Sequence, residues 1–337
     1  MKSRLLLVCS FVLMTLFGAS FASAQSNTDC PVVTLFNMWA PSSPAGAPNG
    51  VIYGLLTNLS NQPDKLVSAT TDVAEAVEFH QTIMGAGDVM QMQSVEGGIP
   101  VATQSYQELK SGGLHIMLVN LTQALVAGQS FNLTLTFEHA NSMTIQVPVR
   151  DTDQATSTMG DMSSGMTMDS AGMSGDMGSM SMGAASVPTA TAVVWPAACA
   201  GMHVVGAWVR AAGPGMPTSA AYALLVNLTG ADDTLLSVTT SAASSTELHD
   251  MTVTAGDVMQ MNPVEGGILI PADGAVMLQP GGKHVMLMGL TQELTSGTMI
   301  DLTLTFAHSG KLNITTPVQD ASVADMSMDG TAQGNGG

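Results

Sequence analysis

The chain has 337 residues, of which 26 are acidic and eight are basic, so its formal net charge is −18 at pH 7. Such an excess of negative charge repels nucleic-acid phosphates and anionic lipid headgroups, which excludes nucleic-acid binding and surface membrane binding as functions. Cations and basic protein surfaces are the partners that this charge favours.

The first 24 residues, 1–24, have the pattern of a secretion signal peptide. Lys2 and Arg4 precede an apolar stretch from Leu5 to Phe17, and the small residues "ASA" at 22–24 form a cleavage site. Thirteen apolar residues are too few to span a bilayer core of about 30 Å as a helix. Cys9 does not stand at the cleavage site, which argues against a lipid anchor. The sequence therefore predicts an exported protein without a membrane span, located in the periplasm, secreted or at the cell surface.

Two regions, 30–150 and 193–320, are copies of one another. Every match has the same offset of 169 positions, and Cys30, Trp39 and Tyr53 correspond to Cys199, Trp208 and Tyr222. The matches include "GDVMQM" at 87–92 and 256–261, "VEGGI" at 95–99 and 264–268, and "TLTF" at 134–137 and 303–306. A repeated unit of roughly 120 residues has the size of one domain, so the sequence predicts two tandem domains.

Each repeat consists of short segments rich in Val, Leu, Ile and Thr, separated by Gly, Pro, Asn and Asp, such as "FNLTLTFEH" and "IDLTLTFAH". This spacing, without a long helical period, predicts an all-β fold of the antiparallel sandwich or Greek-key barrel type.

Cys30 and Cys199 begin the two repeats. In an oxidising compartment they could pair with each other, pair with another chain, or stay buried as free thiols.

The region between the repeats, 151–192, differs in composition. It consists largely of Gly, Ser, Asp and Met, with eight methionines between positions 159 and 182. Such a segment buries too little apolar surface to offset its ordering entropy, so it is predicted to be a flexible linker, and 321–337 a disordered tail. The two domains are then expected to bind their ligands independently, as beads on a tether.

The segment "KHVMLMGL" at 283–290 places His284 and Met286 on one face of a predicted strand, because alternate residues in a strand point to the same side. "LHIMLVNL" at 114–121 repeats the arrangement. An upstream His and Met recur at the same spacing in both halves. The predicted metal ligands are His80, Met92, His115 and Met117 in the first repeat and His249, Met261, His284 and Met286 in the second.

Two imidazoles and two thioethers favour one metal state above others. Soft sulfur ligands select Cu(I), whereas Ca²⁺ and Mg²⁺ prefer oxygen and Zn²⁺ seldom takes a thioether. A lone His is more often a hydrogen-bonded structural residue and a strand Met is usually core filler, so the prediction depends on the two matched sets. His139 and His308 follow strand ends without a Met two residues on, and Met202 and His203 have no counterpart in the first repeat. We expect no ligand role for these four.

Both repeats resemble the periplasmic copper chaperones of the PCu(A)C type, whose pattern is H(M)-x10-M-x21-H-x-M. "EFHQT…VMQM…GGLHIMLVNL" and "ELHDM…VMQM…GGKHVMLMGL" place the eight residues above on the ligand positions. Gln81 and Asp250 stand where the pattern allows a second Met, and the spacer between the Met and the second His has 22 residues where the pattern has 21. The resemblance implies two cupredoxin-like domains that carry Cu(I) and deliver it to the copper A centre of cytochrome c oxidase. The implied acceptor is subunit II of that enzyme or another copper-accepting protein.

Two other functions compete with that of a copper chaperone. A storage protein would bind several copper ions through the methionines of the linker. A blue-copper electron-transfer protein would need a Cys thiolate beside two His, yet the cysteines lie about 50 residues before the first His. Neither a nucleophile elbow nor a phosphate loop occurs, so the sequence predicts a binding protein and not an enzyme.

Overall fold

The structure is a computed structural model that describes residues 30, 32–84, 90–151, 196–254 and 258–321. The predicted signal peptide and nearly all of the predicted linker and tail lie outside these residues. Within the described part of the chain, no helix has the length and apolar character that crossing a membrane requires.

Among the residues described, the first repeat forms ten strands and the second repeat forms ten more, with one short 3₁₀ helix, η1 (Ala197–Cys199), before the second set. The strands of the first domain are β1 (Val33–Pro41), β2 (Asn49–Asn58), β3 (Asp64–Thr71), β4 (Ala74–Met84), β5 (Met90–Ser94), β6 (Ile99–Val101), β7 (Ser105–Leu109), β8 (Leu114–Leu121), β9 (Ser130–Phe137) and β10 (Met143–Arg150). Those of the second are β11 (Met202–Arg210), β12 (Thr218–Asn227), β13 (Asp233–Thr239), β14 (Ala243–Thr254), β15 (Val258–Pro263), β16 (Ile268–Ile270), β17 (Gly274–Leu278), β18 (His284–Leu290), β19 (Met299–Phe306) and β20 (Lys311–Gln319).

The two domains have the same topology. The strand order is β5-β4-β8-β2-β1-β10-β9-β3-β6 in the first and β15-β14-β18-β12-β11-β20-β19-β13-β16 in the second, with β7 and β17 paired to β2 and β12. The β1–β10 and β11–β20 pairs are parallel, and the other recorded strand pairs are antiparallel. The prediction of two tandem all-β domains of the cupredoxin-like Greek-key type is confirmed.

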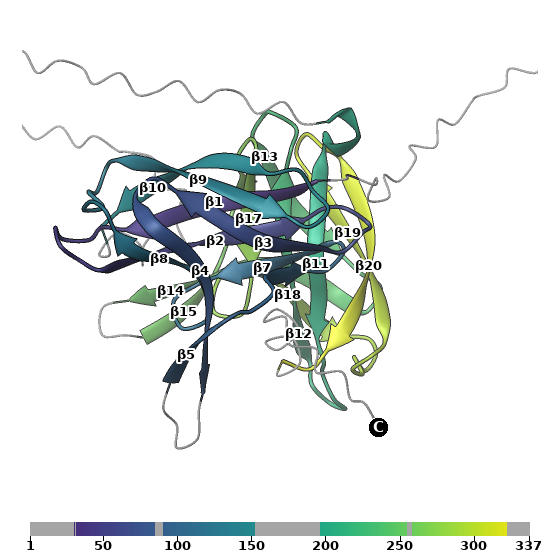
Figure 1. Cartoon of the computed structure of the whole chain (residues 1–337). Helices are drawn as coiled ribbons and strands as arrows, with labels where there is room; N and C mark the ends of the chain where they lie inside the picture. The colour runs from purple at the N-terminus through teal and green to yellow at the C-terminus, as the bar shows by residue number, and fades with distance from the viewer. Residues whose placement is uncertain (1–29, 31, 85–89, 152–195, 255–257, 322–337) are drawn as a thin grey trace, which may run out of the picture.

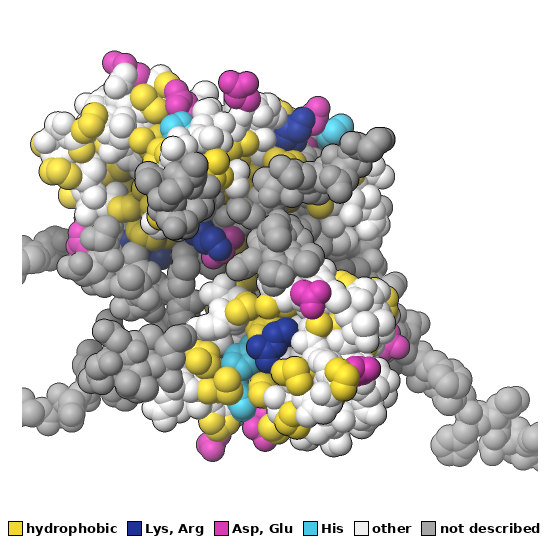
Figure 2. All heavy atoms as spheres, turned by 90° about the horizontal axis from the view of Figure 1, so that it is seen from below, with side chains coloured by type: hydrophobic (Ala, Val, Ile, Leu, Met, Phe, Trp, Pro, Cys, Tyr) yellow, Lys and Arg dark blue, Asp and Glu magenta, His cyan; other side chains and the backbone are white. Residues whose placement is uncertain are grey.

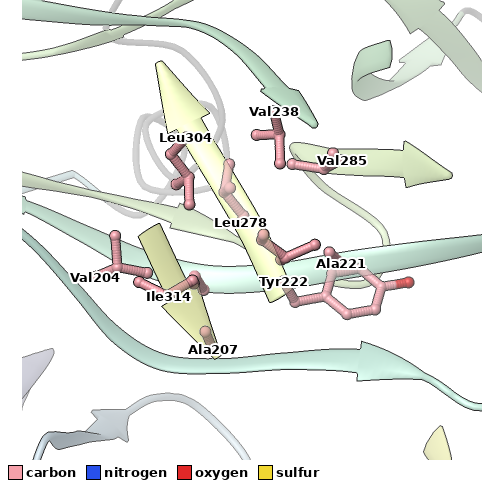
Figure 3. Close-up of a pocket in the computed structure, with 11 residues that line it drawn as sticks. Val204, Ala207, Ala221, Tyr222, Val238, Leu278, Val285, Leu304 and Ile314 are labelled. Atoms are coloured by element: carbon pink, nitrogen blue, oxygen red, sulfur yellow. The ribbon is translucent and has the colours of Figure 1, made fainter. Parts of the chain in front are cut away.

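Alternation along the strands builds a separate core in each domain. In β9 every second residue, from Phe131 to Phe137, faces inward, and β19 repeats this pattern. Figure 3 shows the core of the second domain, where Val238, Leu304 and Ile314 converge. Because each repeat fills its own interior, each domain has the apolar core that independent folding requires.

The two domains contact one another, so they are not separate beads on a tether, whereas their independent binding of ligands stays a prediction. A disulfide joins Cys30 to Cys199, which settles the alternatives left open for the cysteines. Around it lies an apolar cluster drawn from both domains. The cluster is formed by Cys30, Phe36, Leu55, Leu59 and Tyr106 of the first domain and by Cys199, Val205, Leu224, Val226, Leu228 and Ala275 of the second. Most of these are equivalent positions in the two repeats, so the domains meet through the same patch of each, as in a two-fold dimer.

Two features give this interface its specific shape. Gly206 donates its backbone N–H to the carbonyl of Gln104 across the interface at 3.1 Å, and a side chain there would come within 2.9 Å of the Tyr106 ring. His203 is buried, and its Nε2 lies 2.8 Å from the Cys199 carbonyl oxygen. Burial lowers the pKa of His203, so the ring is neutral and Nε2–H is the donor. His203 is therefore a structural residue beside the disulfide.

His139 and His308 lie at the turns after β9 and β19, and a buried aspartate holds each of these turns. Asp233 is buried and accepts hydrogen bonds from the backbone N–H groups of Thr234, His308 and Ser309, and Asp64 holds the equivalent turn in the first domain. Burial alone would raise the pKa of Asp233, but the hydrogen bonds from Ser309, His308 and Thr234 outweigh it and lower the pKa to about 2.

Replacing Asp233 with Asn should destabilise the protein in a pH-dependent way. A carboxyl whose pKa falls from 3.8 to about 2 on folding stabilises the native state by about 2 kcal/mol above pH 4. This contribution is lost as the pH falls from about 4 to about 2, where the folded carboxyl becomes protonated. Chemical unfolding at pH 6 and pH 2 should therefore separate the two proteins only at pH 6. The exposed Asp320→Asn serves as the control, and an equal loss from both variants would contradict this role.

Candidate metal centre

Three neighbouring strands bring the four predicted ligands of the first repeat together. His80 on β4 pairs directly with His115 on β8, and Met92 on β5 pairs with Thr82, two residues beyond His80. Directly paired residues and residues two apart share one face of a sheet, so His80, Met92, His115 and Met117 all lie on the same face. The opposite face belongs to the core and carries the buried Phe79–Ile116 pair.

The second repeat reproduces this arrangement on β14, β15 and β18. His249 pairs with His284, and Met286 follows two residues after His284 on the same face. Met261 pairs with Met251, which stands two residues after His249. Met251 thus belongs to the same face, although matching the two repeats missed it because its counterpart is Thr82. The two-residue alternation along β14 is the signal that would have found it.

The imidazoles of each pair lie close together in an edge-to-face arrangement. Their ring centroids are 5.9 Å apart for His80 and His115 and 5.7 Å apart for His249 and His284. His115 and His284 are only 3% and 4% exposed. Burying a polar ring this far from water destabilises the folded protein unless the ring nitrogens have binding partners.

Hydrogen bonds orient both rings of the first site. Nδ1 of His115 lies 3.0 Å from the Gly113 carbonyl, so it carries the proton and Nε2 carries the lone pair. Nε2 of His80 lies 2.8 Å from the Glu78 carboxylate, which leaves the lone pair on Nδ1 when the ring is neutral. Nδ1 of His80 and Nε2 of His115 are both buried without a hydrogen-bond partner. These are the two nitrogens that a metal ion would use.

The second site is oriented in the same way. Nδ1 of His284 lies 2.9 Å from the Gly282 carbonyl, and Nε2 of His249 lies 3.0 Å from the Glu247 carboxylate. Nδ1 of His249 is buried and lacks a partner, as in His80. Carbonyl or carboxylate partners on the outer ring nitrogen are typical of histidines that bind metal.

The thioethers form the accessible side of each site. Met92 and Met261 lie on the outermost strand of each sheet and are 54% and 45% exposed, whereas Met117 and Met286 are half-buried. Figure 1 shows the hairpin of β4 and β5 projecting from the first domain, and Figure 2 shows histidine side chains at the surface with hydrophobic side chains around them. An ion held here would be buried on its imidazole side and open on its methionine side.

Aromatic rings border the face beyond the histidines. The Tyr222 ring centroid lies 6.3 Å from that of His284 and 4.5 Å from that of Trp208, and Trp39 and Tyr53 form the equivalent pair in the first domain. In Figure 3 the Tyr222 hydroxyl points away from the apolar core. In the second domain Tyr222 thus shields one side of the His284 ring from water.

The donor set is defined by sulfur as well as nitrogen. Within the described residues, His, Cys, Asp and Glu alone form no group of three or more that could hold a metal ion. Two imidazoles without sulfur offer too few donors for a closed site, so the methionines would be needed to complete each set. That combination fits Cu(I) and fits Zn²⁺ or Ca²⁺ poorly.

Removing the carboxylate behind His249 should weaken the second site without unfolding it. Glu247→Ala leaves Nε2 of His249 without its acceptor, so the ring is free to turn and to exchange its proton between nitrogens. We expect Cu(I) affinity at this site to fall about 10- to 100-fold, the usual cost of losing an outer partner of a ligand. Competition titration measures the loss, and ¹⁵N signals of the ring report the proton position. The exposed turn variant Glu265→Ala should change neither, and an unchanged affinity in Glu247→Ala would contradict the assignment.

The fold and this face define a tandem β-domain protein with a histidine–methionine surface on each domain. Residues 33–149 and 202–318 match the family described as "Putative lipoprotein LpqE-like", and together they make up more than half of the chain. The chain therefore belongs to the LpqE-like family.

Two curated relatives and two solved structures are similar to parts of this chain. "Putative lipoprotein Lxx21020" of Leifsonia xyli is 40% identical over 125 residues, which cover 37% of this chain and 74% of the relative. "Uncharacterized protein RP573" of Rickettsia prowazekii is 31% identical over 101 residues; the match covers 30% of this chain and about half, 55%, of the relative. The solution structure of apo-DR1885 from Deinococcus radiodurans is 31% identical with a TM-score of 0.30, and covers 44% of this chain and 97% of that one. The copper-bound PCuAC domain from PmoF2 is 24% identical with a TM-score of 0.30, and covers 35% and 92%. The resemblance to PCuAC domains inferred from the sequence is thus confirmed.

Proposed function

We propose that this chain is a Cu(I) carrier that binds one ion on the histidine–methionine face of each domain. The observation that carries the proposal is the pair of inward ring nitrogens of His80 and His115, buried and without partners beside two methionines. Such nitrogens destabilise a protein unless something binds them. In the second domain Nδ1 of His249 is likewise buried without a partner, and Met261 and Met286 lie on the same face as His249.

The ligand types suit a carrier more than a permanent copper centre. A thioether has no proton to lose and cannot form a disulfide, so it stays available in an oxidising compartment. Without a thiolate the ion is held less tightly than at a cysteine site. The exposure of Met92 and Met261 lets an acceptor replace these sulfurs first. Transfer is then a stepwise exchange of ligands in which the ion keeps its oxidation state.

The proposed location is outside the cytoplasm, and the proposed acceptor is the copper A centre of cytochrome c oxidase subunit II. The location is supported by the signal pattern at 1–24 and by the lipoprotein description of the family. It is also supported by the disulfide between Cys30 and Cys199, a bond typical of oxidising compartments. The acceptor follows from the resemblance to copper chaperones. We propose a binding role and no catalytic one.

The disulfide argues against electron transfer. Both cysteines in the described residues are bonded to each other, so neither supplies the thiolate that a blue-copper centre needs. Storage by the linker remains the second candidate because of its eight methionines, which lie outside the described residues. The two functions differ in how many ions the protein binds and which residues bind them.

Replacement of residues 155–185 by Gly and Ser distinguishes a carrier from a store. Both forms are titrated with Cu(I) without oxygen against a coloured chelator, then mixed with the copper-free soluble domain of oxidase subunit II. A carrier retains two tight equivalents after replacement and loses them to the acceptor. If most of the bound copper disappears with the linker, the protein is a store. If both equivalents remain after mixing, the proposed acceptor is wrong.

A further inference from the structure

We propose that Met251 is an additional Cu(I) ligand of the second site, which makes the two sites of the chain unequal. The inference depends on the proposed function and goes beyond it, because the repeated set contains no residue at this position. It assigns two imidazoles and three thioethers to the second site, against two imidazoles and two thioethers in the first.

The strand register places Met251 within the site. It stands directly opposite Met261 on the neighbouring strand β15, and it follows His249 by two residues on β14. Directly paired residues in an antiparallel sheet have Cβ atoms about 4.5–5.5 Å apart, which lets two thioether sulfurs reach a common ion. The Met251 side chain is half-buried, so it lies against the face and does not extend fully into water.

The first domain has no methionine at the equivalent position. Thr82 occupies the equivalent position, opposite Met92, and is half-buried in the same way. A neutral hydroxyl is a hard donor with little affinity for Cu(I), so no sulfur stands opposite Met92 on β4. The two sites therefore differ by one sulfur at a position where the backbone pairing is the same.

The extra thioether allows an exchange within the second site. The Cu–S bond to the exposed Met261 breaks while a Cu–S bond to Met251 forms. Copper remains Cu(I), and neither a proton nor an electron moves. The second site can thus release Met261 toward an acceptor and still hold the ion with four donors. In the first site, release of Met92 leaves three.

Variants of the full chain that exchange single residues between equivalent positions of the two domains test this inference. The second site is measured alone in a His115→Ala background, and the first site alone in a His284→Ala background. Leucine replaces methionine because the two have similar volumes. In the first site, Met92→Leu should weaken Cu(I) binding at least about 10-fold, since losing a ligand costs no less than losing its outer partner.

In the second site, Met261→Leu should cost less than about 3-fold, because Met251 takes its place, and the double variant with Met251→Thr should restore the 10-fold loss. Thr82→Met should in turn rescue Met92→Leu. Met288→Val is the matched control: Met288 shares the face but lies beyond Met286, and Val119 is its counterpart. It should leave affinity unchanged.

The outcomes separate this inference from the proposed function. If Met261→Leu weakens the second site as much as Met92→Leu weakens the first, Met251 is not a ligand while the copper sites stand. If neither Met92→Leu nor the double variant weakens binding, the methionines of the proposed function are not ligands. Only a large loss in the first site, a small one in the second and a rescue by Thr82→Met supports the inference in full.

Discussion

Replacing His284 with alanine is expected to abolish tight Cu(I) binding in the second domain and to leave the first site intact. His284 contributes the more deeply buried imidazole of its pair and is 4% exposed. Its ring is fixed by the Gly282 carbonyl, which directs Nε2 toward the site. Outer partners of a ligand usually contribute 10- to 100-fold to affinity, so loss of the ligand itself should cost at least about 100-fold.

The fold should survive this change because His284 lies on the outer face of β18, opposite the side that packs in the core. Competition titration should show one tight equivalent where the natural chain shows two. His308→Ala is a matched control, since His308 is an exposed histidine at the turn after β19 beside Asp233. Two tight equivalents in the His284→Ala protein would mean that the imidazole pair of β14 and β18 does not bind copper.

The second large effect is expected from Cys30→Ser combined with Cys199→Ser. The disulfide links residues 169 positions apart, and closing a loop of that size stabilises a folded chain by up to about 5 kcal/mol in the chain-entropy description. Each domain keeps its own core, so the variant should retain its β-sheet circular dichroism. The loss should appear in the contact between the domains.

Amide exchange at Gly206 reports that contact directly, because its N–H bonds to the Gln104 carbonyl of the other domain. We expect its protection to fall by more than that of core strands such as β9 and β19. Cys30→Ser alone should have the same effect, since either change removes the bond. If the midpoint of unfolding and the protection of Gly206 both stay unchanged, the apolar cluster alone holds the domains together.

Much of the fold and of the candidate site could be predicted from the sequence because the two-residue alternation of a strand and the repeat at an offset of 169 residues indicate the same side chains. The alternation of a strand places His284 beside Met286, and the offset of 169 shows the same pair as His115 and Met117. The packing of one domain against the other could not be predicted in this way. Strand β12 is buried on both faces along nearly its whole length. From sequence, such a strand cannot be told apart from one buried within a single domain.

The sequence could predict neither the place of Met251 in the site nor which ring nitrogens carry the lone pairs, and the physical reasons differ. A search for residues common to both repeats discards any position where the repeats differ, and Met251 faces Met261 where Thr82 faces Met92. Which nitrogen of an imidazole carries the lone pair depends on hydrogen bonds to Glu78 and Gly113, and these appear only once strands are paired. The roles of the linker methionines depend on residues that the structure does not describe.

A titration of the natural mature chain with Cu(I), followed residue by residue, tests the central claim most directly. Without oxygen, ring ¹⁵N and methionine methyl signals are recorded as copper is added. The first two equivalents should shift the eight ligands shared by the two repeats, with Nδ1 of His80 and His249 and Nε2 of His115 and His284 moving most. The linker methyl signals should move only afterwards. If the linker methionines respond first and the four rings do not, the histidine–methionine faces are not the copper sites of this protein.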